Sequence, residues 1–518
     1  MQAHAALKQP LPTALYTAAQ VRELDRVAIE VQGIPGIQLM KRAGRACFAA
    51  LLARWNLATA QEAADNPEAD VLTVFCGSGN NAGDGYVIAA LAAQRCRAVE
   101  VVQVADAAKL SGDARLAYEF AQQEGVAMRP FAPDLDLRSG VLVDALLGTG
   151  LSGDVRGDYL PAIECINASG LPVVAVDIPS GLCSDSGRVL GGAIKAALTV
   201  TFIGVKRGMI TGRGPALCGE LQFDDLQVPT AVYDRVPAAS QRLELRDALA
   251  NLPRREADAH KGDFGHVLVI GGDSGFGGAV MMAAEAAART GAGLVSVATR
   301  PEHVPALLAR RPELMVMGVN SGQELATLLT RPSVLVVGPG LGRTPWSEQL
   351  LREAVHSGLP MVVDADALNI LAEGRVVPEL PARPPWIVTP HPGEAARLLS
   401  SSSDAVQADR FAAVEGLQQK LDCTVVLKGA GSLVASAERL AVCAGGNPGM
   451  ASGGMGDVLS GVLGGLLAQG LAPADAAALG VSLHAAAGDL AAEDSGERGL
   501  LATDLIPCVR ELLNGLVN

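Results

Sequence analysis

The sequence lacks an excess of positive charge and any long apolar run, and each absence excludes a class of protein. Lys and Arg number 41 against 55 Asp and Glu, which gives a formal net charge of −14. Nucleic-acid binding relies on clustered cations, so we expect no nucleic-acid partner. Gly, Pro or charge interrupts every hydrophobic run before it reaches bilayer length, so we expect no membrane partner. The first residues also lack the apolar core of a secretory signal, and we expect a cytoplasmic protein.

Cysteine pairs and aromatic residues are also scarce. The nine cysteines include no Cys-x-x-Cys pair, and an odd number cannot form a complete set of intrachain disulfides. We expect small buried thiols in a reducing compartment. Aromatic residues make up only 3% of a chain that is 49% hydrophobic and contains 59 glycines, which is typical of an Ala/Gly-rich globular protein. At 518 residues, it should form more than one domain.

Short Val-rich segments alternate with Ala/Leu-rich helical patterns in both halves of the chain. Continuous apolar strands of this kind favour parallel sheets that are buried on both faces. The predicted strands lie within residues 71–75, 99–104, 141–147, 172–178, 266–272, 333–340, 361–368 and 424–431. The pattern lapses between about residues 230 and 258, where prolines and charges collect. We therefore predict two α/β domains, at residues 15–230 and 245–515, joined by a linker at residues 231–244.

In the first half, VLTVFCGSGNNAGDGYVIAALAA (71–93) predicts a strand, a Gly/Asn loop and a helix. This arrangement directs backbone amides toward an anion, although the spacing is not the dinucleotide Gly-x-Gly-x-x-Gly pattern. A tight turn with Asn and Asp caps is the alternative.

Two later strands, in VLVDALLGTGLSGDVRG (141–157) and VVAVDIPSGLCSDSG (173–187), end close to Asp144 and Asp177. The carboxyl ends of parallel strands line one crevice, so three loops should converge there. Asn81, Asp144 and Ser180 offer hard oxygen ligands, which suit an alkali or alkaline-earth cation. In the alternative interpretation, both aspartates merely cap helices.

With LYTAAQVRELDRVAIEVQGIPGIQLMKRAG (15–44) and TFIGVKRGM (201–209), these motifs resemble the YjeF N-terminal family, the NAD(P)H-hydrate epimerases. The resemblance implies a Rossmann-like three-layer α/β/α fold and a potassium ion at Asn81, Asp144 and Ser180. It implies substrate contacts at Asn80, Asn81, Ala82, Gly83, Asp84, Gly148, Thr149, Gly150, Leu151, Ser152, Gly153, Asp154 and Asp177. Charge develops near the nicotinamide ring during epimerisation, and Asp177 is our candidate for the general acid or base.

The second half begins with another strand, glycine loop and helix, in HKGDFGHVLVIGGDSGFGGAVMMAAEAAARTGAGLVSVAT (260–299). Four further loops follow predicted strands: GPGLGR (338–343), DADALN (364–369), TPHPGE (389–394) and LKGAG (427–431). Because such loops meet at one edge of a parallel sheet, we expect a shared crevice.

The stretch NPGMASGGMGDVLSG (447–461) predicts a loop that leads into a helix N-terminus. The amides of Gly454, Met455 and Gly456 would form an anion hole there, with Asp457 as the base beside it. A glycine-rich helix packed tightly on a neighbour would explain Gly461, Gly464 and Gly465, but it would not explain Asp457.

The anion hole is similar to that of ribokinase-type kinases. With TPHPGEAARLL (389–399) and RGLLATDLIP (498–507), the second half resembles the YjeF C-terminal family, the ADP- or ATP-dependent NAD(P)H-hydrate dehydratases of ribokinase-like α/β/α fold. The resemblance implies Mg²⁺ and Asp457 as the catalytic base. It implies hydrate contacts at Ala279, Gly342, His391 and Asp457, and adenine-nucleotide contacts at Lys428, Gly429, Ala430, Gly431, Ser432 and Gly456.

The two resemblances together predict a bifunctional repair enzyme. It would interconvert the R and S hydrates of NADH and NADPH (NADHX and NADPHX) and dehydrate the S epimer, converting ADP to AMP and phosphate. We also expect a homo-oligomer. The competing hypothesis is a ribokinase-like small-molecule kinase fused to a non-catalytic ligand-binding or scaffold domain.

Overall fold

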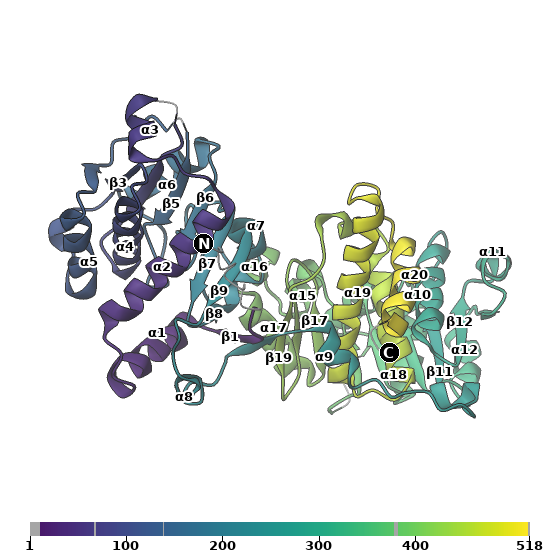
Figure 1. The fold of residues 1–518 in the computed structure, drawn as a ribbon. Helices are drawn as coiled ribbons and strands as arrows, with labels where there is room; N and C mark the ends of the chain where they lie inside the picture. The colour runs from purple at the N-terminus through teal and green to yellow at the C-terminus, as the bar shows by residue number, and fades with distance from the viewer. Residues whose placement is uncertain (1–10, 67–68, 138, 378–381, 516–518) are drawn as a thin grey trace. The chain divides into compact units, whose positions relative to one another are not determined.

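The computed structural model describes residues 11–66, 69–137, 139–377 and 382–515. The chain divides into two compact units, Met1–Gln241 and Arg242–Asn518, which Figure 1 colours from purple to yellow along the sequence. The divide lies within residues 231–244, where we expected the linker. No helix in the described ranges is long and apolar enough to cross a membrane.

The first unit is built on a parallel sheet with the strand order β4-β3-β2-β5-β6-β7-β9. Its strands are β2 (Leu72–Cys76), β3 (Val99–Gln103), β4 (Ala127–Pro130), β5 (Val141–Ala145), β6 (Val173–Val176), β7 (Leu198–Phe202) and β9 (Glu220–Asp224). All four strands predicted in this half are confirmed. A separate pairing joins β1 (Ala14–Tyr16) to β8 (Val205–Lys206) in parallel and to β10 (Ser240–Arg242) in antiparallel orientation.

Helices cover both faces of this sheet. On one face, Val74 and Val143 pack with Val87 and other side chains of the helices; on the opposite face, Phe75 packs with Ile163. The first layer contains α1 (Ala18–Arg26), α2 (Gly36–Arg54), α4 (Asn80–Gln94) and α5 (Gly112–Gln123), and the second contains α6 (Tyr159–Ala168). The short helices are α3 (Ala60–Asp65), α7 (Gly214–Cys218) and α8 (Thr230–Tyr233). The predicted three-layer fold is confirmed.

In the second unit, seven parallel strands follow the order β13-β12-β11-β14-β15-β16-β17, and two antiparallel strands, β18 and β19, extend the sheet. The strands are β11 (His266–Ile270), β12 (Leu294–Thr299), β13 (Met315–Gly318), β14 (Val334–Val337), β15 (Met361–Val363), β16 (Trp386–Val388), β17 (Thr424–Leu427), β18 (Ser432–Ala435) and β19 (Leu440–Cys443). The strands predicted in this half are also confirmed, as is its α/β class.

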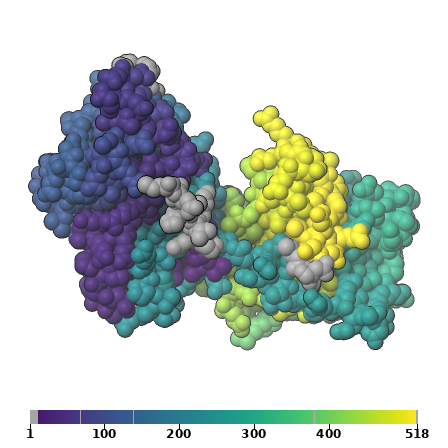
Figure 2. Space-filling model, in the orientation of Figure 1, coloured from purple at the N-terminus to yellow at the C-terminus, as the bar shows by residue number. Residues whose placement is uncertain are grey.

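Two helical layers enclose this second sheet. One contains α10 (Gly277–Thr290), α18 (Met455–Ala468), α19 (Pro473–Ser495) and α20 (Leu505–Gly515), whose apolar side chains share a core with Val267 and Val336. In Figure 2 the yellow C-terminal segment covers part of the visible surface of this unit. The remaining helices are α9 (Leu245–Leu249), α11 (Val304–Arg310), α12 (Gly322–Leu328), α13 (Pro345–His356), α14 (Ala365–Glu373), α15 (Pro392–Leu398), α16 (Ser403–Ala408) and α17 (Arg410–Leu421).

Glycines bring α18 into close contact with α10 and the sheet. A Cβ atom on Gly461 would lie 2.1 Å from the backbone oxygen of Ala283, and one on Gly464 would lie 2.4 Å from Cγ2 of Val336. Tight packing therefore explains the glycines inside α18. It leaves Asp457, in the first turn of the helix, to be explained by the site at its N-terminus.

Candidate active sites

The first site lies at the carboxyl ends of β2, β5 and β6. The loop after β2 leads into α4, whose first turn contains Asn80 and Asn81. The side-chain Nδ2 of Asn81 donates to the Leu147 carbonyl at 3.2 Å. Its Oδ1 is buried and has no hydrogen-bond partner among the described residues. Because an unpartnered buried carbonyl is costly, this oxygen indicates a place for a ligand.

Two hydrogen bonds join Ser180 to the side chain of Asp144. The amide of Ser180 donates to Oδ2 of Asp144 at 2.8 Å, and its hydroxyl donates to Oδ1 at 2.6 Å. The Leu147 amide donates to the Ser180 hydroxyl at 2.8 Å, so Leu147 links this pair to Asn81. Burial raises the pKa of Asp144 to about 6, although the Ser180 hydrogen bonds oppose the shift. The sequence-predicted oxygen donors are thus brought together, and their chemistry fits a cation.

A cavity of about 650 Å³ opens beside these residues. Most of the predicted substrate contacts line it: Asn80, Asn81, Asp84, Gly148, Thr149, Gly150, Leu151, Ser152 and Asp177. Four predicted contacts do not line it: Ala82, Gly83, Gly153 and Asp154. Gly83 instead packs on Met40, since a Cβ atom there would lie 2.5 Å from the Met40 sulfur.

Asp177 occupies a strained position on the cavity wall. Its φ of 69° lies in the left-handed region, which is unusual for a residue with a side chain and is common at functional sites. Its Oδ1 accepts from the Phe202 amide at 3.2 Å and is ion-paired with Nζ of Lys206. Neither Asp177 nor Asp144 caps a helix in the described chain, so the helix-cap alternative is wrong.

Two charged residues of this site, Asp25 and Lys206, were not among the residues predicted from sequence, whereas Asp84 was. Lys206 is fully buried, and Asp25 and Asp84 line the cavity with Asp177. Burial and the negative charge of Asp177 raise the pKa of Asp25 to about 6, while Lys206 opposes the shift. Burial, Asp177 and Asp25 raise the pKa of Asp84 well above its usual value. Asp25 and Lys206 lie in the two segments that carried the family resemblance, which was the available signal.

The second site lies at the N-terminus of α18. Gly454 has a φ of 92° and the helix begins at Met455, so the turn requires glycine. Burial and the charge of Asp364 raise the pKa of Asp457 to about 7, and Lys428 lowers it. A Cβ atom on Gly456 would lie 3.3 Å from Nζ of Lys428. The helix terminus, the predicted base and the predicted phosphate-binding lysine are therefore neighbours.

Asp364 organises this site and was not among the predicted site residues. Its Oδ1 accepts from Nζ of Lys428 at 2.6 Å, and its Oδ2 accepts from the Ser460 hydroxyl at 2.8 Å. Glu394 lies 4.0 Å from Nζ of Lys428. Burial raises the pKa of Glu394 to about 7, although Lys428 opposes the shift. The positive charge of Lys428 therefore acts on three carboxyl groups: those of Asp364, Glu394 and Asp457.

His391 caps the helix that follows it. Its Nδ1 accepts from the Gly393 amide at 2.9 Å, and its Nε2 lies 3.2 Å from Oε1 of Glu394. Burial and the positive charges of Lys428 and Arg397 lower the pKa of His391, which favours the neutral ring. The imidazole is half-exposed, so it combines a structural role with access from solvent.

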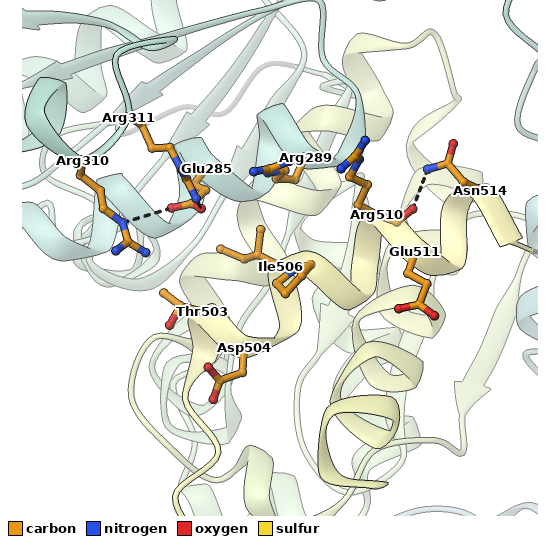
Figure 3. Close-up of a pocket in the computed structure, with 11 residues that line it drawn as sticks. Glu285, Arg289, Arg310, Arg311, Thr503, Asp504, Ile506, Arg510, Glu511 and Asn514 are labelled. Atoms are coloured by element: carbon orange, nitrogen blue, oxygen red, sulfur yellow. Dashed lines mark hydrogen bonds and ion pairs between the residues drawn. The ribbon is translucent and has the colours of Figure 1, made fainter. Parts of the chain in front are cut away.

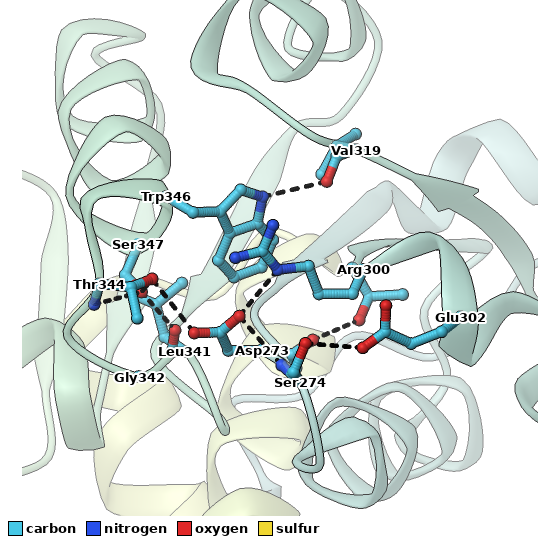
Figure 4. A network of polar contacts seen from close by, with 12 residues as sticks. Asp273, Ser274, Arg300, Glu302, Val319, Leu341, Gly342, Thr344, Trp346 and Ser347 are labelled. Carbon is cyan, nitrogen blue, oxygen red and sulfur yellow. Dashed lines mark hydrogen bonds and ion pairs between the residues drawn. The ribbon is translucent and has the colours of Figure 1, made fainter.

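The loop that contains Gly342 is fixed by two aspartates. The Gly342 amide donates to Asp366 at 3.0 Å, and Asp273 lies on its other side. Burial tends to raise the pKa of Asp273, but hydrogen bonds from Arg300, at 2.7 Å, and Thr344 hold it below the usual value. Figure 4 shows this network, in which the guanidinium of Arg300 also stacks on Trp346. Ala279, in the first turn of α10, lies beside Gly340 of the same loop.

Five of the six predicted nucleotide-binding residues, at 428–432, form the turn between β17 and β18, and the sixth, Gly456, lies in the first turn of α18. The Ser432 hydroxyl donates to the Gly429 carbonyl at 3.0 Å, and Gly429 and Gly431 both have positive φ. Arg410 is buried beneath the turn and donates through Nη2 to the carbonyls of Lys428 and Gly431. Burial lowers the pKa of Arg410 to about 10. Arg410 was also not among the predicted site residues.

A further cavity of about 620 Å³ in the second unit is not the predicted site (Figure 3). Its ionisable lining comprises Arg289, Arg310, Arg311 and Arg510, with Glu285, Asp504 and Glu511. Glu285 is buried and ion-paired with Arg311. Four cations and three acids nearly cancel, so this cavity offers no strong field for an anion.

Comparisons with known proteins agree with the two resemblances. Residues 36–208 match the family model of the YjeF-related protein N-terminus, and residues 267–510 match that of NAD(P)H-hydrate dehydratase. The bifunctional NAD(P)H-hydrate repair enzyme Nnr of Coxiella burnetii is 50% identical, covering 97% of this chain and 100% of its own. The Escherichia coli enzyme of the same name is 40% identical, covering 99% and 97%.

A solved structure gives the fold of the second half. A ribokinase-like superfamily protein from Enterococcus faecalis superposes with a TM-score of 0.50 at 31% identity, covering 53% of this chain and 96% of its own. The ribokinase-like prediction is confirmed, and a plain kinase fused to a scaffold domain is not favoured. The chain belongs to the bifunctional NAD(P)H-hydrate repair enzymes.

Proposed function

We propose that the two units act on the hydrates of NADH and NADPH in consecutive steps. The first unit interconverts the R and S epimers, and the second dehydrates the S epimer while ADP is converted to AMP and phosphate. The main support is the position of Asp457, which lies at a helix N-terminus beside Lys428 and Asp364. That arrangement suits phosphoryl transfer, in which positioning and charge stabilisation dominate.

In the dehydratase, Asp457 takes the proton of the C6 hydroxyl. The oxygen attacks the terminal phosphorus of ADP, and the bond to the AMP oxygen breaks. The ring nitrogen lone pair then expels phosphate from C6, and loss of a proton from C5 restores the double bond of NAD(P)H. A pKa of about 7 suits this base, because it can both accept and return a proton near neutral pH.

The anion hole and its neighbours would hold the nucleotide. Amides at the start of α18, with Gly456, and the ammonium of Lys428 would bind the phosphates, while the turn from Gly429 to Ser432 would hold the rest of the nucleotide. Mg²⁺ would neutralise phosphate charge, with few direct protein ligands. Ala279, Gly342 and His391 would contact the hydrate around Asp457.

In the epimerase, Asn81, Asp144 and Ser180 would hold K⁺. The unpartnered Oδ1 of Asn81 supports this assignment, since a cation supplies the partner that the described residues do not. A bound cation would also fix the Leu147 segment and, with it, the loop 148–152 on the cavity wall. Asp177 would face the reacting carbon as the general base.

The test uses purified protein with Mg²⁺, K⁺ and mixed-epimer NADPH hydrate, and follows the absorbance of reduced nicotinamide. ADP and ATP are added in parallel. Complete conversion with ADP supports both activities and names the donor. Conversion that stops at the S fraction refutes the epimerase, and no nucleotide-dependent signal refutes the dehydratase.

A further inference from the structure

The epimerase cavity contains more acidic groups than its buried cation can neutralise. Asp25 from α1, Asp84 from α4 and Asp177 after β6 all line it. The buried ammonium of Lys206 is committed to Asp177, since Nζ also donates to the Thr201 hydroxyl at 2.9 Å and contacts the Phe202 carbonyl. Asp25 therefore shares a cavity with Asp84 and Asp177, and no ion pair joins it to an ammonium among the described residues.

The other charged groups on the cavity wall are Arg22, on α1 with Asp25, and Asp113, on α5. Arg22 is exposed and Asp113 is partly exposed, so solvent screens their charges. Carboxyl groups that share one site do not all ionise, and at least one of them retains a proton.

We propose that Asp25 is a second catalytic residue of the epimerase, acting as the acid, and that Lys206 is the positioning residue that reserves Asp177 as the base. The proposal rests on the epimerase function proposed above. Asp25 and Asp177 belong to different elements. One group can therefore protonate the hydroxyl that leaves, and the other can deprotonate the water that adds. Asp84 is the weaker candidate for the acid, because its more strongly raised pKa favours retention of its proton.

The step balances without another reactant. Asp25 gives its proton to the C6 hydroxyl, the C6–O bond breaks, and water leaves as the ring nitrogen lone pair forms a C=N double bond. Water then adds to the other face of C6, and the C=N electrons return to nitrogen. Asp177 takes the proton of the added water and releases it to solvent, and Asp25 takes up a proton from solvent, so both groups return to their starting states.

In the full-length chain, the dehydratase activity of the second unit can report the rate of epimerisation in the first. With nucleotide and mixed epimers, the S fraction is dehydrated directly, and the R fraction is consumed only as fast as it is epimerised. We expect Asp25→Asn to slow the R phase by about 10²–10⁴-fold, the range for general acid–base groups, without changing the S phase. The matched control is Glu119→Gln, which removes a half-exposed carboxylate of α5 that does not line the cavity and should leave both phases unchanged.

The pH profile separates chemistry from structure. After subtraction of the spontaneous rate, the wild-type R phase should decline as pH rises through about 6, where Asp25 loses its proton, and Asp25→Asn should abolish that limb. Lys206→Met should lower kcat for epimer exchange with little change in KM, and should alter the pH profile.

An R phase at the wild-type rate in Asp25→Asn would overturn the role of Asp25. An unchanged profile in Lys206→Met would overturn that of Lys206. A wild-type enzyme without an R phase would instead refute the epimerase function itself.

Discussion

The state of Asp457 gives a quantitative prediction for the dehydratase. Its pKa is about 7, raised by burial and by Asp364. Because the base acts only when ionised, about 10% of the enzyme is active at pH 6 and about 90% at pH 8. We expect kcat/KM for the S epimer to rise about tenfold between pH 5 and 6, and then to level off above pH 7.

Two variants separate the base from its electrostatic surroundings. Asp457→Asn should lower kcat by about 10²–10⁴-fold and remove the pH limb, because no ionisable base remains. Lys428→Met should shift the limb to higher pH, because Lys428 lowers the pKa of Asp457. Asp494→Asn, an exposed change on α19 of the same unit, is the control and should keep the wild-type profile.

The assay measures initial rates of NAD(P)H formation from purified S epimer at saturating nucleotide and constant ionic strength. A profile that is flat between pH 6 and 8 would refute the assignment of Asp457 as a base with a pKa near 7. In Lys428→Met, a rise of kcat/KM at the wild-type pH, or at lower pH, would refute the electrostatic coupling between Lys428 and Asp457.

Three further predictions test packing and binding. Gly461→Ala should lower the free energy of unfolding of the C-terminal unit by about 1–3 kcal/mol, because its Cβ would overlap the α10 backbone. Gly416→Ala, on α17, should raise it by up to about 1 kcal/mol, because its Cβ would meet only Leu399, at an ordinary contact distance of 3.6 Å. Calorimetry that gives both variants the same sign would contradict the packing argument. Asn81→Ala should weaken K⁺ activation of epimer exchange about tenfold, as expected for the loss of one ligand. A KCl titration identical to that of the wild type would show that Asn81 does not bind the cation. Arg410→Met should raise KM for ADP more than it lowers kcat, because the turn between β17 and β18 loses the hydrogen bonds that Arg410 donates to it. An unchanged KM in steady-state assays would limit Arg410 to a role in stability.

The fold could be predicted because its signals are local. Each apolar run such as that of β5 or β14 is bounded by Gly, Asp or Pro, and a strand buried on both faces must be continuously hydrophobic. The glycines at the start of α18 were equally informative, since Gly454 adopts a conformation that other residues avoid. Parallel topology then places all the strand ends along one edge, which brought Asn81, Asp144 and Asp177 together.

The missed residues depend on contacts between distant segments. Lys206 lies on β8 and reaches Asp177 only because the chain folds back after β7. Arg410 lies on a helix before β17, and its function follows from the carbonyls above it rather than from any motif. Asp364 was visible in a strand-end loop, but its partner Lys428 lies in the turn after another strand, β17, so sequence alone did not pair them.

The two sites share an electrostatic arrangement, although their folds differ. In each, one lysine is ion-paired with a neighbouring carboxylate: Lys206 with Asp177, and Lys428 with Asp364 and, at 4.0 Å, with Glu394. Further carboxyl groups surround each pair, and burial raises the pKa of Asp25 to about 6 and that of Asp457 to about 7. In each site the lysine is ion-paired with an acid, while another acid nearby is able to exchange a proton near neutral pH. Both halves of the proposed reaction need such a group, because each transfers a proton to or from the same C6 hydroxyl.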